Sequence, residues 1–88
     1  MNRTRRKEID GVIAMIEDIK SQIETQAQIV ADICSDEEAY RDAIPENMQE
    51  SARYETADTA ARALSSAQDE LEAIDFDGIM ESLREAQL

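Results

Sequence analysis

The sequence has 88 residues and a formal net charge of −12; it is 42% apolar and 34% charged, and only three of its residues are aromatic. A chain this short closes one small hydrophobic core, which excludes a large enzyme fold and indicates a single domain over residues 1–88. One Cys and no His exclude an internal disulfide framework and a zinc site of the usual Cys/His kind. With two Gly and one Pro, the composition predicts an all-α fold of long helices.

The first helix is predicted over residues 5–43, because alternating steps of three and four residues give nine apolar positions out of eleven. This predicted seam comprises Ile9, Val12, Ile16, Ile19, Ile23, Gln26, Val30, Ile33, Glu37, Tyr40 and Ile44. Polar residues inside a seam commonly fix its register, so Gln26 is interpreted as specifying helix pairing rather than binding a ligand.

A turn is predicted over residues 44–47, because Pro45 is incompatible with a helix interior and also removes Ile44 from the helical region. Asn47, followed three residues later by Glu50, matches the pattern of a helix N-cap. We therefore expect a second helix over residues 48–87. The connection is so short that the two helices must be antiparallel neighbours in a coiled-coil hairpin.

The second helix carries a seam of smaller residues, which favours close packing against the bulky first helix. Its members are Ala57, Ala60, Leu64, Ala67, Leu71 and Ile74. Residues 75–78 are the weak point of this helix. Asp77 is a possible cap for a short third helix, but we favour a kinked continuation.

Two helices bury one stripe each, so some apolar surface of this chain is left for another chain. The apolar residues beside or outside the predicted seams are Ile13, Met15, Ile29, Cys34 and Phe76. We therefore expect the hairpin to assemble into a four-helix-bundle homodimer or a higher oligomer.

Two clusters are candidate ligand-binding sites. The first is the basic start of the chain, with Arg3, Arg5, Arg6 and Lys7, which the helix macrodipole disfavours. It is either a solvated arm or an anion site. The second flanks the turn, with Tyr40, Arg41, Arg53 and Tyr54. There the tyrosines either staple the hairpin, with Arg53 stacked near Tyr40, or line a ligand site.

Antiparallel pairing of two hairpins would bring the basic start of one subunit to the turn of its partner. Aromatic faces and phosphate-binding Arg side chains would then line one intersubunit pocket suited to a nucleotide. The sequence offers no phosphate loop and no catalytic triad, so we expect a non-enzymatic protein without cofactor or metal. Carboxylate pairs such as Asp32 with Asp36 are interpreted as part of a solvated acidic face.

The segments Ile-Pro-Glu-Asn-Met-Gln at residues 44–49 and Ser-Ala-Arg-Tyr-Glu at residues 51–55, with Arg-Arg-Lys near the start, resemble short helical proteins of phages and mobile elements of gut Firmicutes. The Asp-Phe-Asp-Gly segment at residues 75–78 departs from the pattern of that group. The resemblance implies a phage-encoded context and no mechanism, and by analogy a role against host defences.

Three functions are compatible with these observations. The first is sequestration of a nucleotide-type immune signal in the intersubunit pockets. The second is an acidic decoy that imitates DNA or covers a basic site on a host defence protein, and the third is a structural coiled-coil scaffold. Because Glu8 and Asp10 follow the basic start in place of a hydrophobic run, we expect no export signal and no membrane contact. The expected location is the cytoplasm of the infected host.

Overall fold

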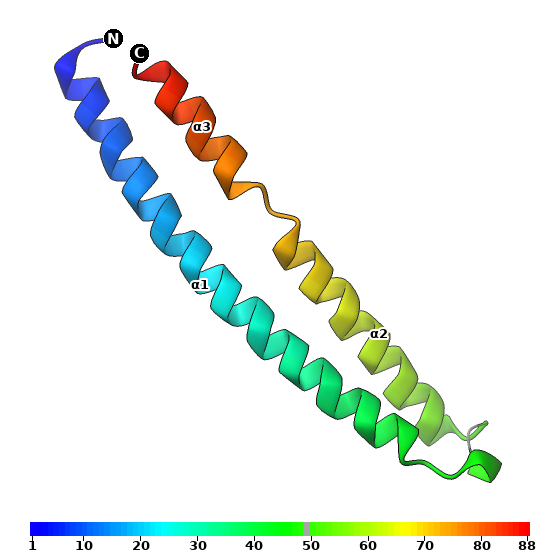
Figure 1. The fold of residues 1–88 in the computed structure, drawn as a ribbon. Coiled ribbons are helices and arrows are strands. Elements are labelled where there is room, and N and C mark those ends of the chain that lie inside the picture. Colours follow the sequence, from blue (N-terminus) through cyan, green and yellow to red (C-terminus); the bar gives the residue numbers. More distant parts are fainter. Residues whose placement is uncertain (49) are drawn as a thin grey trace.

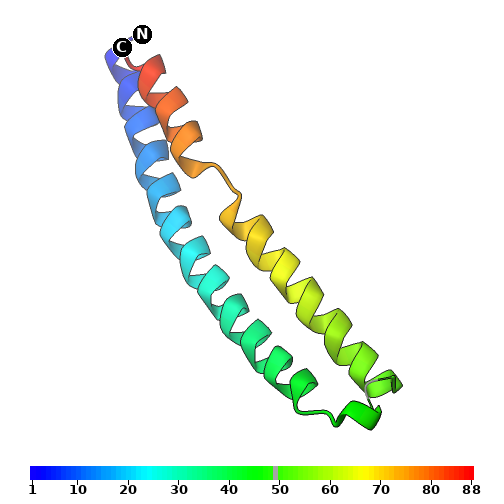
Figure 2. The ribbon, with the colours of Figure 1, turned by 45° about the vertical axis from the view of Figure 1, so that its right-hand side comes forward.

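The protein is a long, thin helical hairpin in a computed structural model that describes residues 1–48 and 50–88. Its elements are α1 (Arg3–Asp42), the 3₁₀ turn η1 (Glu46–Met48), α2 (Ala52–Glu72) and α3 (Phe76–Ala86), and no strand occurs among the described residues. α2 and α3 return along α1, so both termini lie at the end opposite the turn (Figures 1 and 2). The molecule measures 69 × 15 × 13 Å, and the predicted all-α hairpin is confirmed.

Local signals set the two ends of α1. At the start, the Asn2 side chain accepts a hydrogen bond from the Arg5 backbone N–H at 2.8 Å, which caps the first turn. At the other end the helix stops at Asp42, three residues before Pro45. The Ile44 backbone N–H donates to the Arg41 carbonyl at 3.1 Å, and Ile44 itself is buried beneath the turn. The predicted helix stop is therefore correct.

The start of α2 differs from the prediction. Asn47 is not its cap, because it lies inside η1, where the Met48 backbone N–H donates to the Pro45 carbonyl at 2.8 Å. The cap is Ser51, whose hydroxyl accepts from the Tyr54 backbone N–H at 3.3 Å. The connection from Asp42 to Ala52 is longer than the predicted turn over residues 44–47, because the chain must cross between two packed helix axes that lie roughly 8–10 Å apart. Gln49, which the predicted second helix included, lies outside the described residues.

The bend expected near residues 75–78 is present as a break between α2 and α3 rather than as a continuous kink. Asp75 caps α3 by accepting a hydrogen bond from the Gly78 backbone N–H at 2.9 Å. A side chain at residue 78 would collide with the Asp75 carboxylate, so Gly suits this position. Asp77, considered as the cap, instead forms an ion pair with Lys20 across the hairpin at 3.0 Å.

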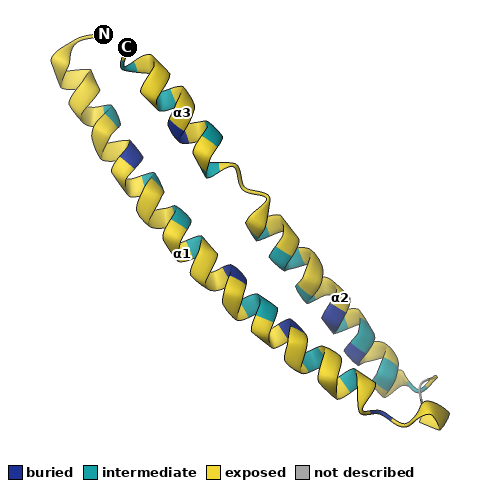
Figure 3. Cartoon of the chain, viewed as in Figure 1, coloured by how far each residue is buried: buried dark blue, intermediate teal, exposed yellow. Residues whose placement is uncertain are grey.

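The stripe of α1 that packs against the second arm is not the predicted one. The structure keeps the half-buried positions Ile9, Ile16, Ile23, Val30 and Glu37, but between them it buries Ile13, Ala27 and Cys34 (Figure 3). Half of the predicted seam is thus wrong, because Val12, Ile19, Gln26, Ile33 and Tyr40 are exposed.

Small residues explain this choice of stripe. Ala57 and Ala61 of α2 are each only 2% exposed, so the backbone of α2 comes close to α1. The Cys34 Sγ atom lies 3.4 Å from the Ala61 carbonyl oxygen. At this separation the small side chain of Cys34 fits between the helices better than a branched one would. Ala60 and Ala67, predicted to face α1, are only half-buried at the side of this contact.

The resulting core is thin. The buried apolar residues are Ile13, Ala27, Cys34, Ile44, Ala57, Ala61 and Met80. The solvent-accessible surface is 6434 Å², whereas a compact monomer of 9.9 kDa has about 5,200 Å². The chain therefore exposes roughly 1,200 Å² more than a globular protein of its mass.

We expect Ala61→Leu to lower the free energy of unfolding by about 1–3 kcal/mol, because the larger side chain must separate α1 from α2. Urea unfolding followed by circular dichroism measures the change. Ala14→Leu, at an exposed position of α1, is the control and should change the stability by less than about 0.5 kcal/mol. Equal stability of the Ala61→Leu chain and the wild type would contradict the close approach of the helices.

Candidate functional site

An aromatic–cation pair stands at the turn, as the sequence predicts. The Arg53 Nε–H donates to the Tyr40 hydroxyl at 2.6 Å, and the Arg53 guanidinium carbon lies 5.3 Å from the centre of the Tyr40 ring. This distance is within the range of a cation–π contact. The pair borders a hollow of about 110 Å³, which is also lined by Ala43, Ile44, Pro45 and Met48.

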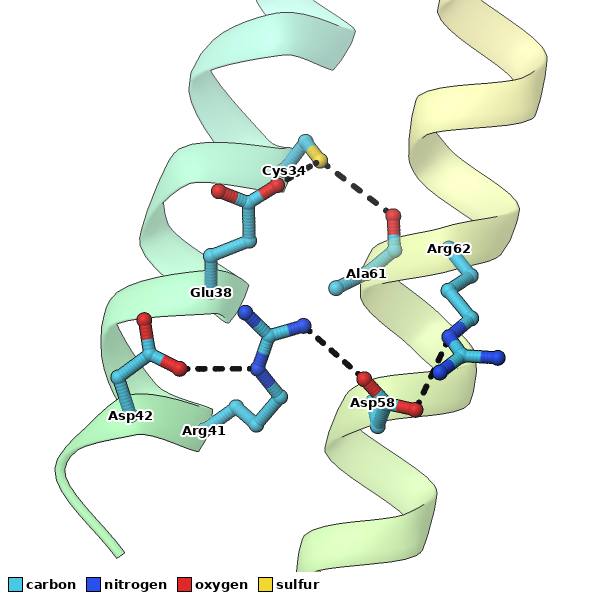
Figure 4. Close-up of polar contacts among 7 residues, drawn as sticks. All are labelled: Cys34, Glu38, Arg41, Asp42, Asp58, Ala61 and Arg62. Atoms are coloured by element: carbon cyan, nitrogen blue, oxygen red, sulfur yellow. Dashed lines mark hydrogen bonds and ion pairs between the residues drawn. The ribbon is translucent and has the colours of Figure 1, made fainter.

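Arg41, a predicted ligand-binding residue, ties the two arms of the hairpin together (Figure 4). Its Nε–H donates to Asp42 at 3.0 Å and its Nη1–H donates to Asp58 of α2 at 3.0 Å. Hydrogen bonding to Asp42 and then to Asp58 raises the pKa of Arg41. Asp58 also accepts from Arg62 at 3.0 Å. Two carboxylates thus neutralise the Arg41 charge, so the geometry gives it a structural role.

Tyr54 does not join the hollow at the turn. It lies in the first turn of α2, is half-buried, and occupies the row of α2 that also contains Ala57 and Ala61. Helical spacing therefore directs Tyr54 toward α1 rather than toward the Tyr40 ring. Of the four predicted residues at the turn, only Tyr40 and Arg53 line the hollow.

The basic start forms about the first one and a half turns of α1 rather than a frayed arm. Arg3, Arg5, Arg6 and Lys7 are all exposed there. The Gln87 side chain donates to the Arg6 carbonyl at 3.1 Å and to the Asp10 carboxylate at 2.5 Å, which holds the end of the chain against this segment. The basic start and the Tyr40–Arg53 pair lie at opposite ends of a rod 69 Å long (Figure 1). One chain alone therefore cannot bring both clusters into one site.

A hollow of about 370 Å³ lies at the break between α2 and α3. Its apolar side is formed by Ile23, Ala27, Leu71, Ile74 and Phe76, and its polar side by Lys20, Glu24, Glu72, Asp75 and Asp77. Lys20 and Asp77 pair with each other, and this hydrogen bond raises the pKa of Lys20. The ion pair between Lys20 and Asp77 therefore neutralises two of the five charged side chains that line the hollow.

A second apolar stripe of α1 faces solvent, and we call it the outer stripe. Its apolar members are Val12, Met15, Ile19, Ile29, Ile33 and Tyr40, each between 41% and 59% exposed. They follow steps of three and four residues, and Gln22, Gln26 and Asp36 occupy the remaining positions. At 100° per residue, the outer stripe lies about 100° around α1 from the buried stripe. The sequence prediction merged these two stripes into a single seam.

The chain has no recognisable relative among the proteins compared with it: no family model, no curated protein and no solved structure matches. Within residues 1–48 and 50–88, no group of three or more Cys, Asp or Glu side chains could hold a metal ion. In the same part of the chain, no helix is both long enough and apolar enough to cross a bilayer. The function must therefore be argued from the surfaces described above.

We expect Cys34 to react slowly with a maleimide, because its thiol is buried and its pKa is raised by burial and then by the neighbouring Glu38. Labelling should be at least about 100-fold slower in the folded chain than in urea. Mass spectrometry of samples quenched at successive times measures both rates. Moving the thiol by one residue, with Cys34→Ala and Ser35→Cys, is the control and should restore fast labelling. Equal rates in buffer and urea would show that this part of the hairpin is open.

Proposed function

We propose that this protein is a non-enzymatic assembly protein that works by packing the outer stripe of α1 against further helices. The observation that carries the proposal is the regular heptad spacing of six exposed apolar side chains along one unbroken helix. Apolar residues scattered over a surface need no explanation, whereas a continuous apolar patch marks an interaction site.

The position of the outer stripe supports helix pairing in particular. A helix in a four-helix bundle contacts two neighbours, so it needs two apolar stripes at roughly a right angle around its axis. In α1, one stripe is used by α2 and α3, and the other lies about 100° away. The surplus of roughly 1,200 Å² over a globular surface exceeds the 800 Å² that each partner of a standard interface buries.

The test is a matched pair of charge insertions. In Ile19→Asp/Ile33→Asp the outer stripe receives two carboxylates, and self-association measured by sedimentation equilibrium should weaken at least about 100-fold, because these groups would lose water on assembly. Ser21→Asp/Ser35→Asp adds the same charge at exposed positions outside both stripes and is the control. Both variants should keep the helical circular dichroism of the wild type.

A wild-type chain that stays monomeric at about 100 µM would refute this function, since an assembly protein must associate in that range. Equal weakening by both double variants would show that added charge, and not the outer stripe, controls association.

Nucleotide-type binding is the second candidate function, and the stacked Arg53–Tyr40 pair favours it. Such a pair supplies an aromatic face for a base and a guanidinium for a phosphate. The adjoining hollow of about 110 Å³ is too small for this ligand, since small-molecule pockets measure about 300–1,000 Å³. A nucleotide site therefore needs a second chain, so this candidate depends on assembly.

We expect a nucleotide ligand, if it binds, to raise the unfolding free energy by about 2.7 kcal/mol at a concentration 100-fold above its dissociation constant. Thermal melting with ATP, cyclic AMP and a cyclic dinucleotide measures this effect. Arg53→Ala should abolish the shift, whereas Arg62→Ala, at an exposed arginine one helical turn beyond Asp58, should retain it. The absence of a shift with every nucleotide would remove this candidate.

A further inference from the structure

We infer that the partner of the outer stripe is a second copy of this chain, with the two α1 helices antiparallel and a two-fold axis at Gln22. This inference rests on the proposed function and names its partner and geometry. Three observations carry it: the symmetry of the outer stripe, the distribution of charge along α1, and the separation of the two predicted ligand clusters within one chain.

Four of the six apolar members of the outer stripe pair with one another about its polar centre, whereas Ile19 lies opposite Gln26. α1 runs from Arg3 to Asp42, so its midpoint lies between Gln22 and Ile23. An antiparallel partner centred there places Val12 opposite Ile33 and Met15 opposite Val30, one residue from Ile29, and each pair occurs twice because of the two-fold axis. Gln22 then lies beside the axis, one residue from its own copy, where two amides can hydrogen-bond to each other. A polar pair in the middle of an apolar seam fixes the register.

The charges along α1 match the same arrangement. The basic start, which is exposed, would lie opposite residues 38–42 of the partner. That segment contains Glu38 and Asp42 against its single cation, Arg41, so its net charge is −1. Cations at the start of a helix, which its own dipole disfavours, would thus be stabilised by acidic residues of the partner.

A competing arrangement has the hairpins stacked so that the outer stripe of each copy covers α2 of the other. The same side of α2 presents small side chains, including Thr56, Ala60 and Ala63, and bulky residues would pack against small ones. In that arrangement the two basic starts lie side by side at one end of the assembly. Both arrangements cover the same stripe, so charge decides between them, and it favours the antiparallel pair.

The antiparallel pair has a consequence for the turn. Arg5 of one copy would lie opposite Tyr40 of the other, close to Arg53, so the cluster at the turn receives a cation from the second chain. The two clusters that lie at opposite ends of one chain become neighbours in the assembly. Each dimer would contain two such clusters, related by the axis at Gln22.

Disulfide trapping tests the geometry. In a Cys34→Ala background, the single variants Val12→Cys and Ile33→Cys are purified and oxidised, alone and mixed. The antiparallel pair gives a disulfide-linked dimer only in the mixture, because the two sites face each other across the axis. Ala14→Cys mixed with Ser35→Cys is the control, since both positions are exposed outside the stripes.

The other results overturn the inference. A disulfide in Ile33→Cys alone indicates parallel helices, and one between Ile33→Cys and Ala63→Cys indicates the stacked arrangement. An oligomer that forms none of these bonds excludes the register centred on Gln22 but leaves the proposed function intact. A chain that remains monomeric removes the proposed function as well.

A second measurement avoids the cysteine variants. Arg5→Ala/Arg6→Ala should weaken self-association about tenfold at low salt, and the difference from wild type should shrink in about 1 M salt. In the stacked arrangement the same substitutions relieve repulsion between neighbouring basic starts, so association would become tighter. Tighter association, or an unchanged constant, would therefore overturn the antiparallel pair.

Discussion

The close approach of α2 to α1 at Ala57 and Ala61 determines how the rest of the hairpin is organised. Because these side chains are small, the two backbones come together, and the α1 residue that meets Ala61 is the small Cys34. Beside Cys34 on α1, the branched residues Ile29 and Ile33 of the outer stripe face solvent. A close contact between the helices thus leaves the bulkier stripe of α1 on the surface, where it is available to other helices.

Features that depend on local chemistry could be predicted from the sequence. Pro45 stops the first helix wherever the rest of the chain goes, and the length of the turn forces the second arm to return antiparallel. The contact of Arg53 with Tyr40 also followed from counting residues outward from the turn. Asn47 matched a cap pattern as well as Ser51 does, and only the path between two packed helices distinguishes them.

The register of α1 and the role of Arg41 could not be predicted because they depend on the other arm. Two stripes of α1 share an apolar heptad pattern, so periodicity alone cannot show which one α2 covers. Arg41 looked available for a ligand, yet Asp58, which holds it, lies 17 residues further along the chain. In a sequence with 21 acidic residues, nothing local marks Asp58 as the one that meets Arg41.

Charge and apolar surface act in opposite directions in this protein. From Glu8 onward the chain has five cations and 21 acids, a net charge of −16, so two copies repel each other over most of their length. The outer stripe attracts a second copy but does not select its orientation, because apolar contact is similar in several arrangements. The basic start carries positive charge. It therefore attracts a second copy where it lies beside acidic residues, and it repels that copy where it lies beside the other basic start. Affinity would therefore come from the outer stripe, and the choice of arrangement from four residues at the start of α1.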